Sequence, residues 1–245
     1  MCAQAQILAS KRVGILWGVG VGPGDPELMT VKALRLLRDC AVIAFPAGRR
    51  GAPGIAQQII QNWLQPDQTQ LPLEFPFVQE SAVLTAAWEQ AATQVWAHLS
   101  QGQDVVFATE GDASFYSTFT YLAQTLQRQH PQVSIQTVPG VCSPLAAAAQ
   151  LAEPLTILQQ RLIVLPALYA IADLEAALDQ ADVVVLMKVA SVYAQVWPIL
   201  ERRRLLARSR VVVRATQPDE EIYADLSDSP NLQLPYFSLM VIHCD

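Results

Sequence analysis

The chain has 245 residues, of which 52% are hydrophobic and 16% charged, and its net charge is −6. This length and apolar content exclude an intrinsically disordered chain and allow one large domain or two small ones. Nucleic-acid-binding domains are usually basic, so the acidic balance disfavours that class. No apolar stretch is long enough to span a membrane, and we expect no signal peptide at the N-terminus.

The 4 cysteines and 3 histidines are scattered along the sequence and form neither a CxxC pair nor a zinc-binding pattern. A disulfide framework is unusual in a chain this long, and isolated thiols are typical of a reducing compartment. We therefore expect no resident metal ion and a cytoplasmic location.

Short apolar runs alternate with helical segments in the first half of the chain. Strands are predicted at residues 13–20, 41–46, 104–109 and 133–138, a short extended piece at 73–77, and helices at 27–38, 55–63, 85–100 and 118–129. Asp25 as a cap and Pro26 in the first turn mark the start of the first helix. This alternation predicts a mostly parallel sheet with helices on its faces.

The second half ends in strands with short connections, which predicts a mixed sheet. Strands are expected at residues 162–165, 183–187, 210–214, 221–226 and 237–243, and helices at 144–151, 173–180 and 191–203. Ser143 and Pro144 are expected as the N-cap and first residue of an alanine-rich helix. Pro198 is expected to kink or shorten the last helix. The predicted α/β domains are residues 1–139 and 140–245.

A glycine-rich loop, GVGVGPGD, follows the first strand and precedes the first helix. It fails the dinucleotide pattern GxGxxG, because Pro23 or Asp25 occupies the third glycine position, and it lacks the GK[ST] of a phosphate-binding loop. Asp25 at a helix start would also repel a phosphate. The loop therefore favours a neutral or cationic ligand, or serves as a plain turn.

Three further segments carry candidate site residues at the ends of predicted strands. Glu110 and Asp112 flank Gly111, and their carboxylates could hold an ammonium group or a ribose hydroxyl, or cap a turn. The segment PGVCS lies where the two halves meet, as a ligand site or a simple turn. Lys188 follows a very apolar strand, where it either faces a pocket or lies at the rim.

Read in order, the segments GVGVGPGDPELMTVKALRLL, ATEGDASFYSTFTYL, VPGVCSPLAAAA, LMKVA and RATQPDEEI resemble the tetrapyrrole methyltransferases that use S-adenosylmethionine. The resemblance covers about residues 13–245. The first, second and fourth segments are most similar to the branch that methylates C20 of precorrin-2 in cobalamin biosynthesis.

The resemblance implies a homodimer of two-domain subunits, with S-adenosylmethionine bound in the cleft between the domains and S-adenosylhomocysteine as its product. The family's cofactor contacts correspond here to Pro23, Glu110, Gly111, Asp112, Phe115, Cys142, Ser143, Met187, Ala215 and Thr216. Two positions depart from the family: Ala113 often is a proline, and Cys142 a serine or threonine.

Methyl transfer to an electron-rich ring carbon mainly requires positioning and electrostatics. If a base removes a proton from the methylated ring, the candidates in order are Asp112, Lys188 and Tyr116. Arg49 and Arg50, in a glycine-rich loop, are the candidates for binding the carboxylates of the tetrapyrrole, with Lys188 as a third.

Several alternatives stay open at the level of sequence. The substrate could be the cobalt-containing ring, another tetrapyrrole carbon, a modified histidine in a translation factor or ribosomal RNA, the last disfavoured by the acidic charge. Ala113 and Cys142 favour a binding protein without catalysis, whereas the intact GPGD and EGD segments favour an enzyme. A nucleotide-binding oxidoreductase is disfavoured because the dinucleotide pattern fails.

Overall fold

The computed structural model describes residues 12–48, 52–76, 78, 80–168 and 170–244. Their contacts divide the chain into two compact units, Met1–Val21 with Met29–Gly140 and Gly22–Leu28 with Val141–Asp245. The short segment Gly22–Leu28 therefore packs with the second unit, although the sequence placed it in the first domain. Both units are α/β, as expected.

The first unit contains a fully parallel five-stranded sheet, as the alternation of strand and helix predicted. Its strands are β1 (Ile15–Gly20), β2 (Val42–Pro46), β3 (Thr69–Leu73), β4 (Val105–Thr109) and β5 (Ser134–Val138). Their spatial order is β3-β2-β4-β1-β5. The carboxyl ends of β4, β1 and β5 consequently lie side by side, where ligands bind in open α/β sheets.

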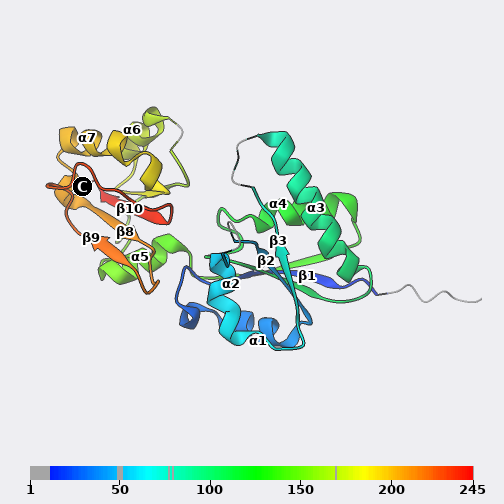
Figure 1. The fold of residues 1–245 in the computed structure, drawn as a ribbon. Coiled ribbons are helices and arrows are strands. Elements are labelled where there is room, and N and C mark those ends of the chain that lie inside the picture. The colour runs from blue at the N-terminus through cyan, green and yellow to red at the C-terminus, as the bar shows by residue number, and fades with distance from the viewer. Residues whose placement is uncertain (1–11, 49–51, 77, 79, 169, 245) are drawn as a thin grey trace, which may run out of the picture. The chain divides into compact units, whose positions relative to one another are not determined.

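Helices cover both faces of this sheet (Figure 1). They are α1 (Val31–Asp39), α2 (Ile55–Ile60, continued by a 3-10 turn, Gln61–Trp63), α3 (Ser81–Leu99) and α4 (Phe119–Gln129). Along β4, Val105 and Phe107 pack under α3 and α4, whereas Val106 and Ala108 pack against α1 and α2. Successive residues of a strand point to opposite faces, so a continuous apolar run fills both cores.

Two predicted elements of the first unit are corrected by the structure. The helix expected at 27–38 begins at Val31, where the Thr30 hydroxyl caps the Ala33 N–H, and a separate 3-10 turn, Pro26–Leu28, precedes it. Asp25 caps that turn by accepting the Glu27 N–H. The extended segment expected at 73–77 is instead β3, Thr69–Leu73, because its polar, exposed residues lie at the sheet border.

The second unit has a mixed five-stranded sheet in the order β6-β7-β10-β8-β9. Its strands are β6 (Leu162–Leu165), β7 (Val183–Met187), β8 (Ser209–Val213), β9 (Glu221–Tyr223) and β10 (Ser238–His243). β6 and β7 are parallel, whereas β10 runs antiparallel to both β7 and β8. The carboxyl ends of β7 and β8 therefore lie at one end of the sheet, and the end of β10 at the other.

The helices of the second unit lie on opposite faces of its sheet. α6 (Ile171–Gln180) and α7 (Tyr193–Arg203) pack on one face, and α5 (Ser143–Leu151) packs on the other through Ala146 and Ala147. Short 3-10 turns, Val189–Ser191 and Leu206–Arg208, precede α7 and β8. In the described part of the chain, no helix is both long and apolar enough to cross a membrane.

The structure differs from two local expectations for the second unit, the N-cap of α5 and a helix shortened at Pro198. The N-cap of α5 is Cys142, one residue before the predicted Ser143, so Pro144 occupies the second helical position. α7 continues through Pro198 for five more residues and ends at Arg203. The buried neighbours Val196, Ile199 and Leu200 hold this helix against the sheet, and that packing outweighs the loss of one backbone hydrogen bond.

Candidate functional site

Three glycines meet at the carboxyl ends of β1, β4 and β5. A Cβ atom on Gly20 would lie 2.7 Å from both the Gly111 carbonyl oxygen and the Gly140 nitrogen, closer than side chains are tolerated. A Cβ on Gly140 would meet the Gly111 oxygen at 2.3 Å. Glycine is therefore required at Gly20 and Gly140 for the three loops to touch backbone to backbone. The result is a surface of peptide groups at the place where the fold binds ligands.

The carboxylate of Asp112 fastens two of these loops. Its Oδ1 accepts the N–H of Ser114 at 2.7 Å, and its Oδ2 accepts the N–H of Gly140 at 2.8 Å. Both oxygens are thus occupied by backbone donors from the loops after β4 and β5. This geometry favours a positioning role for Asp112 over the role of a general base.

The loop after β4 is also fixed at its far end. The hydroxyls of Thr109 and Ser117 share a buried 3.0 Å hydrogen bond, and Ser117 Oγ accepts the N–H of Phe119 at the start of α4. Ala113 is buried in the core formed with α3 and α4, so this departure from the family fills an apolar position. The loop is consequently held by three kinds of contact: the hydrogen bonds of Asp112, those of Ser117 and the packing of Ala113.

Three predicted site residues of this loop, Glu110, Phe115 and Tyr116, are exposed or half-buried. Glu110 is exposed, and Phe115 and Tyr116 stack edge to face with ring centroids 4.6 Å apart. Tyr116 has a positive φ of 53° and a 54% exposed side chain. A bulky residue in the left-handed region costs free energy, and such strain is concentrated at functional sites.

In the second unit, the segment that contains Pro23 is held by the loop after β8. The Thr216 hydroxyl accepts the N–H of Asp25 at 3.0 Å, and Gln217 Nε2 donates to the Pro23 carbonyl at 3.2 Å. Glu220 accepts the N–H of Thr216 and fixes the same loop. The buried Pro23 and the half-buried Thr216 therefore belong to neighbouring segments, although they are far apart in the sequence.

The ends of β7 and β8 carry strained backbone. Lys188, Arg214 and Thr216 have positive φ values of 55°, 47° and 67°. Lys188 Nζ lies 5.7 Å from the ring centroid of Tyr236, which favours a cation–π contact. Arg214 is engaged by Asp219 at 2.8 Å. Of these two basic residues, Arg214 has a carboxylate partner, whereas Lys188 has none among the described residues.

Four further predicted site residues, Met187, Ala215, Cys142 and Ser143, lie in the second unit. Met187 ends β7 and, with the buried Ala215, belongs to the core under α5. Cys142 and Ser143 are half-buried at the start of α5, and the Cys142 side chain makes no capping hydrogen bond. Arg49 and Arg50 lie outside the described residues. Among the described residues, no group of three or more His, Cys, Asp or Glu could hold a metal ion.

Sequence reasoning missed several residues that build these loops. Gly20, Gly140, Gln217 and Glu220 lie within the quoted motifs, but none was assigned a role. For the glycines, the signal was their position at or just beyond the end of a predicted strand. Tyr236 and Ser117 had no comparable signal, because their partners are joined to them only by the folded chain.

Comparison with known proteins identifies relatives over almost the entire chain. A model of the tetrapyrrole (corrin/porphyrin) methylases matches residues 15–229. The chain is 34% identical to the cobalt-precorrin-2 C(20)-methyltransferase of Salmonella typhimurium, over 94% of this chain and 96% of that protein. It is 32% identical to the precorrin-2 C(20)-methyltransferase of a Sinorhizobium species, over 94% and 95% of the two chains.

Two solved methyltransferase structures are similar in fold to this chain. A cobalt precorrin-4 methyltransferase is 25% identical, with a TM-score of 0.71 over 93% of this chain and 94% of that one. A uroporphyrin-III C-methyltransferase from Thermus thermophilus, solved with S-adenosylhomocysteine, is 22% identical, with a TM-score of 0.66 over 94% and 97%. The second likeness concerns the fold alone.

Proposed function

Because the chain belongs to the tetrapyrrole (corrin/porphyrin) methylases, we propose that it transfers a methyl group from S-adenosylmethionine to C20 of precorrin-2 in cobalamin biosynthesis. The observation that carries the proposal is the match, at 32–34% identity and almost full length, to relatives named for C20 methylation. An enzyme is favoured over a binding protein, since these relatives are methyltransferases.

The residues present fit S-adenosylmethionine better than they fit a phosphate-containing nucleotide. The ligand carries a sulfonium and an ammonium group, and the loop after β4 offers the carboxylates of Glu110 and Asp112 together with peptide groups. Opposite charges stabilise one another, so an acidic loop favours a cation and disfavours a phosphate. We assign Pro23, Glu110, Gly111, Asp112, Phe115, Cys142, Ser143, Met187, Ala215 and Thr216 as the contacts of this ligand.

When bound, S-adenosylmethionine supplies a methyl group activated by the sulfonium: the sulfur–methyl bond breaks, its electron pair stays on sulfur, and a bond to C20 forms. The chain's own part is to align the two reactants, since alignment can supply much of the rate. The fixed loop around Asp112 serves that purpose.

A proton must leave C20 after the new bond has formed. Of the three candidate bases, Asp112 already accepts two backbone N–H groups, whereas Lys188 and the exposed Tyr116 keep free capacity in the described structure. We therefore place Lys188 and Tyr116 ahead of Asp112 for contact with the reacting ring. Arg49 and Arg50 stay predicted partners of its carboxylates.

The test is a turnover assay under anaerobic conditions. Purified protein is mixed with S-adenosylmethionine and either metal-free or cobalt-containing precorrin-2, and product mass is followed together with S-adenosylhomocysteine. One added methyl group per S-adenosylhomocysteine, located on C20 by NMR, would support the proposal, and the preferred substrate would decide between the two ring forms. Tight S-adenosylhomocysteine binding without turnover on either ring would contradict it.

We also propose that the subunits form a homodimer in the cytoplasm, as the family resemblance suggests. Sedimentation equilibrium of the full chain measures the assembly state directly, and a monomer at all concentrations would contradict this part.

A further inference from the structure

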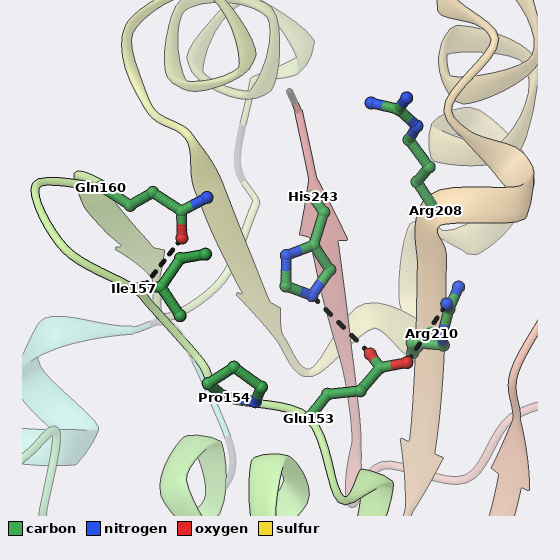
Figure 2. Close-up of a pocket in the computed structure, with 7 residues that line it drawn as sticks. All are labelled: Glu153, Pro154, Ile157, Gln160, Arg208, Arg210 and His243. Atoms are coloured by element: carbon green, nitrogen blue, oxygen red, sulfur yellow. Dashed lines mark hydrogen bonds and ion pairs between the residues drawn. The ribbon is translucent and has the colours of Figure 1, made fainter.

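A hollow lies in the second unit, and the proposed methyl transfer does not use it. It has a volume of about 370 Å³ and is lined by Glu153, Pro154, Ile157, Gln160, Arg208, Arg210 and His243. This size falls within the range of small-molecule sites. Figure 2 shows the loop of Pro154, Ile157 and Gln160 on one side and the two arginines on the other, with Glu153 and His243 facing each other.

Within the second unit, the hollow lies at the end of the sheet remote from the candidate methyl-transfer residues of that unit, Lys188 and Thr216. His243 ends β10 and pairs with Val183 at the start of β7, whereas Leu239 pairs with Met187 at the end of β7. At about 3.3 Å per residue, the two ends of β10 are roughly 15 Å apart. Arg210 lies near the start of β8, while Ala215 and Thr216 follow its end. The hollow is therefore a separate place from Lys188 and Thr216.

The charges that line the hollow do not balance. Among the described residues that line it, Glu153 is the only carboxylate, and it is shared by Arg210 at 3.3 Å and by His243 at 3.8 Å. Both separations exceed the 2.7–2.9 Å typical of a strong charged hydrogen bond. Arg208 has no ion pair within the described residues. The lining thus carries excess positive charge on a protein whose net charge is −6.

Two nearby carboxylates, Asp182 and Asp225, already accept hydrogen bonds from other residues. Asp182 accepts the N–H of Arg161 and pairs with its guanidinium at 3.6 Å. Asp225 accepts both the N–H and the hydroxyl of Ser227, and these bonds, with a smaller contribution from the positive charge of Arg210, lower the pKa of Asp225. Arg210 donates one further hydrogen bond, to the Ala207 carbonyl at 2.8 Å, and its planar group retains donors for a ligand.

We propose that this hollow binds a small organic anion, with a carboxylate or phosphate head held by Arg208 and Arg210 and an aliphatic body packed on Pro154 and Ile157. The guanidinium fork matches the oxygens of both head groups. An apolar wall opposite a charged one requires a ligand with two unlike ends, because a bare inorganic ion would leave Pro154 and Ile157 uncovered. Glu153 limits affinity by competing for Arg210.

The experiment follows the histidine side chains of the full chain by NMR. The protein has 3 histidines, and the other two, His98 and His130, lie in the first unit, so they report any nonspecific effect. The spectrum of His243→Gln assigns the resonance. Butyl phosphate, pentanoate, inorganic phosphate and butanol are titrated separately at constant ionic strength, which keeps charge screening equal.

We expect butyl phosphate or pentanoate to shift the His243 resonance in a saturable way, and inorganic phosphate and butanol to act much more weakly. Arg208→Gln should weaken binding about fivefold, because one charged contact is lost. Glu153→Gln should strengthen it several-fold, because the internal competitor loses its charge. If these residues served only to stabilise the fold, the two variants would not change the affinity in opposite directions.

Arg128→Gln is the matched control, since Arg128 is an exposed arginine of the first unit with only a 4.0 Å ion pair. Its affinity for either probe should equal that of the unmodified chain, and thermal unfolding checks that every variant is folded. The proposal is overturned if neither organic anion shifts His243, if butanol or inorganic phosphate acts equally well, or if Arg208→Gln and Arg128→Gln bind alike.

Discussion

The Oδ2 atom of Asp112 accepts a 2.8 Å hydrogen bond from the backbone N–H of Gly140, 28 residues later in the chain. This bond joins the loop after β4 to the loop after β5, directly beside the contact of Gly20 with Gly111 and Gly140. The relative position of these loops therefore depends on one carboxylate, and its removal offers a direct test of the proposed cofactor site.

We expect Asp112→Asn to weaken S-adenosylhomocysteine binding about tenfold or more. An asparagine has one acceptor oxygen, so either the Ser114 or the Gly140 N–H must face an amide donor. Loss of one partly buried charged hydrogen bond accounts for that magnitude. Calorimetry measures the affinity, with the exposed Asp67→Asn as control. Equal affinity in the two variants would argue against the positioning role.

A variant of Lys188 can separate the effect of its strained backbone on stability from the effect of its side chain on turnover. Lys188→Gly should relieve the positive φ of 55°, leaving the free energy of unfolding equal or about 0.5–1 kcal/mol higher, while turnover falls about 100-fold or more. Binding of S-adenosylhomocysteine should change little. Denaturant unfolding and the turnover assay measure the two effects.

The control for this variant is Lys32→Ala, since Lys32 Nζ also lies over an aromatic ring, 5.4 Å from the centroid of Trp17. Its turnover should equal that of the unmodified chain. Full turnover by Lys188→Gly would exclude Lys188 both as the base and as a substrate contact.

Cys142 is the N-cap of α5, but its side chain makes no capping hydrogen bond. Serine at this position can accept a backbone N–H of the first turn, so we expect Cys142→Ser to raise the free energy of unfolding by about 0.5–1 kcal/mol. Cys142→Ala should bring no such gain. Urea unfolding compares the three proteins, and equal midpoints for the serine and alanine variants would contradict the prediction.

The free energy of unfolding should fall at alkaline pH. Burial, with smaller effects from Asp104 and Asp39, raises the pKa of Cys40 from 9.0 to about 11, and burial raises that of Tyr193 from 10.0 to about 12. The unfolded chain therefore loses these protons first, so the native state is progressively disfavoured as pH rises above about 9.

Denaturant unfolding between pH 8 and pH 10.5 measures this slope. Cys40→Ala should make it shallower in that interval, because the variant lacks the thiol that ionises only on unfolding. Tyr193→Phe serves as a second comparison, although it also removes a 2.6 Å hydrogen bond to the Ser229 carbonyl and lowers stability at every pH. An unchanged slope in Cys40→Ala would contradict the assignment.

The sequence alone determined much of the architecture. Apolar runs such as residues 105–109 and 183–187 predicted buried strands, because a strand covered on both faces needs apolar residues throughout. The alternation with helices predicted the parallel sheet, and the order of the motifs indicated the family. These features can be predicted from composition and local pattern, because each one is expressed by residues that are close together in the sequence.

Only the tertiary structure decided how the loops are fastened. The bond from Gly140 to Asp112 and that from Asp25 to Thr216 join residues 28 and 191 positions apart, and such pairs leave no local pattern. The start of α1 was also decided by the folded chain: Thr30 caps it, after a separate 3-10 turn at Pro26–Leu28. Long-range hydrogen bonds and close backbone contacts arise only when the chain is folded, so they decided the site's geometry.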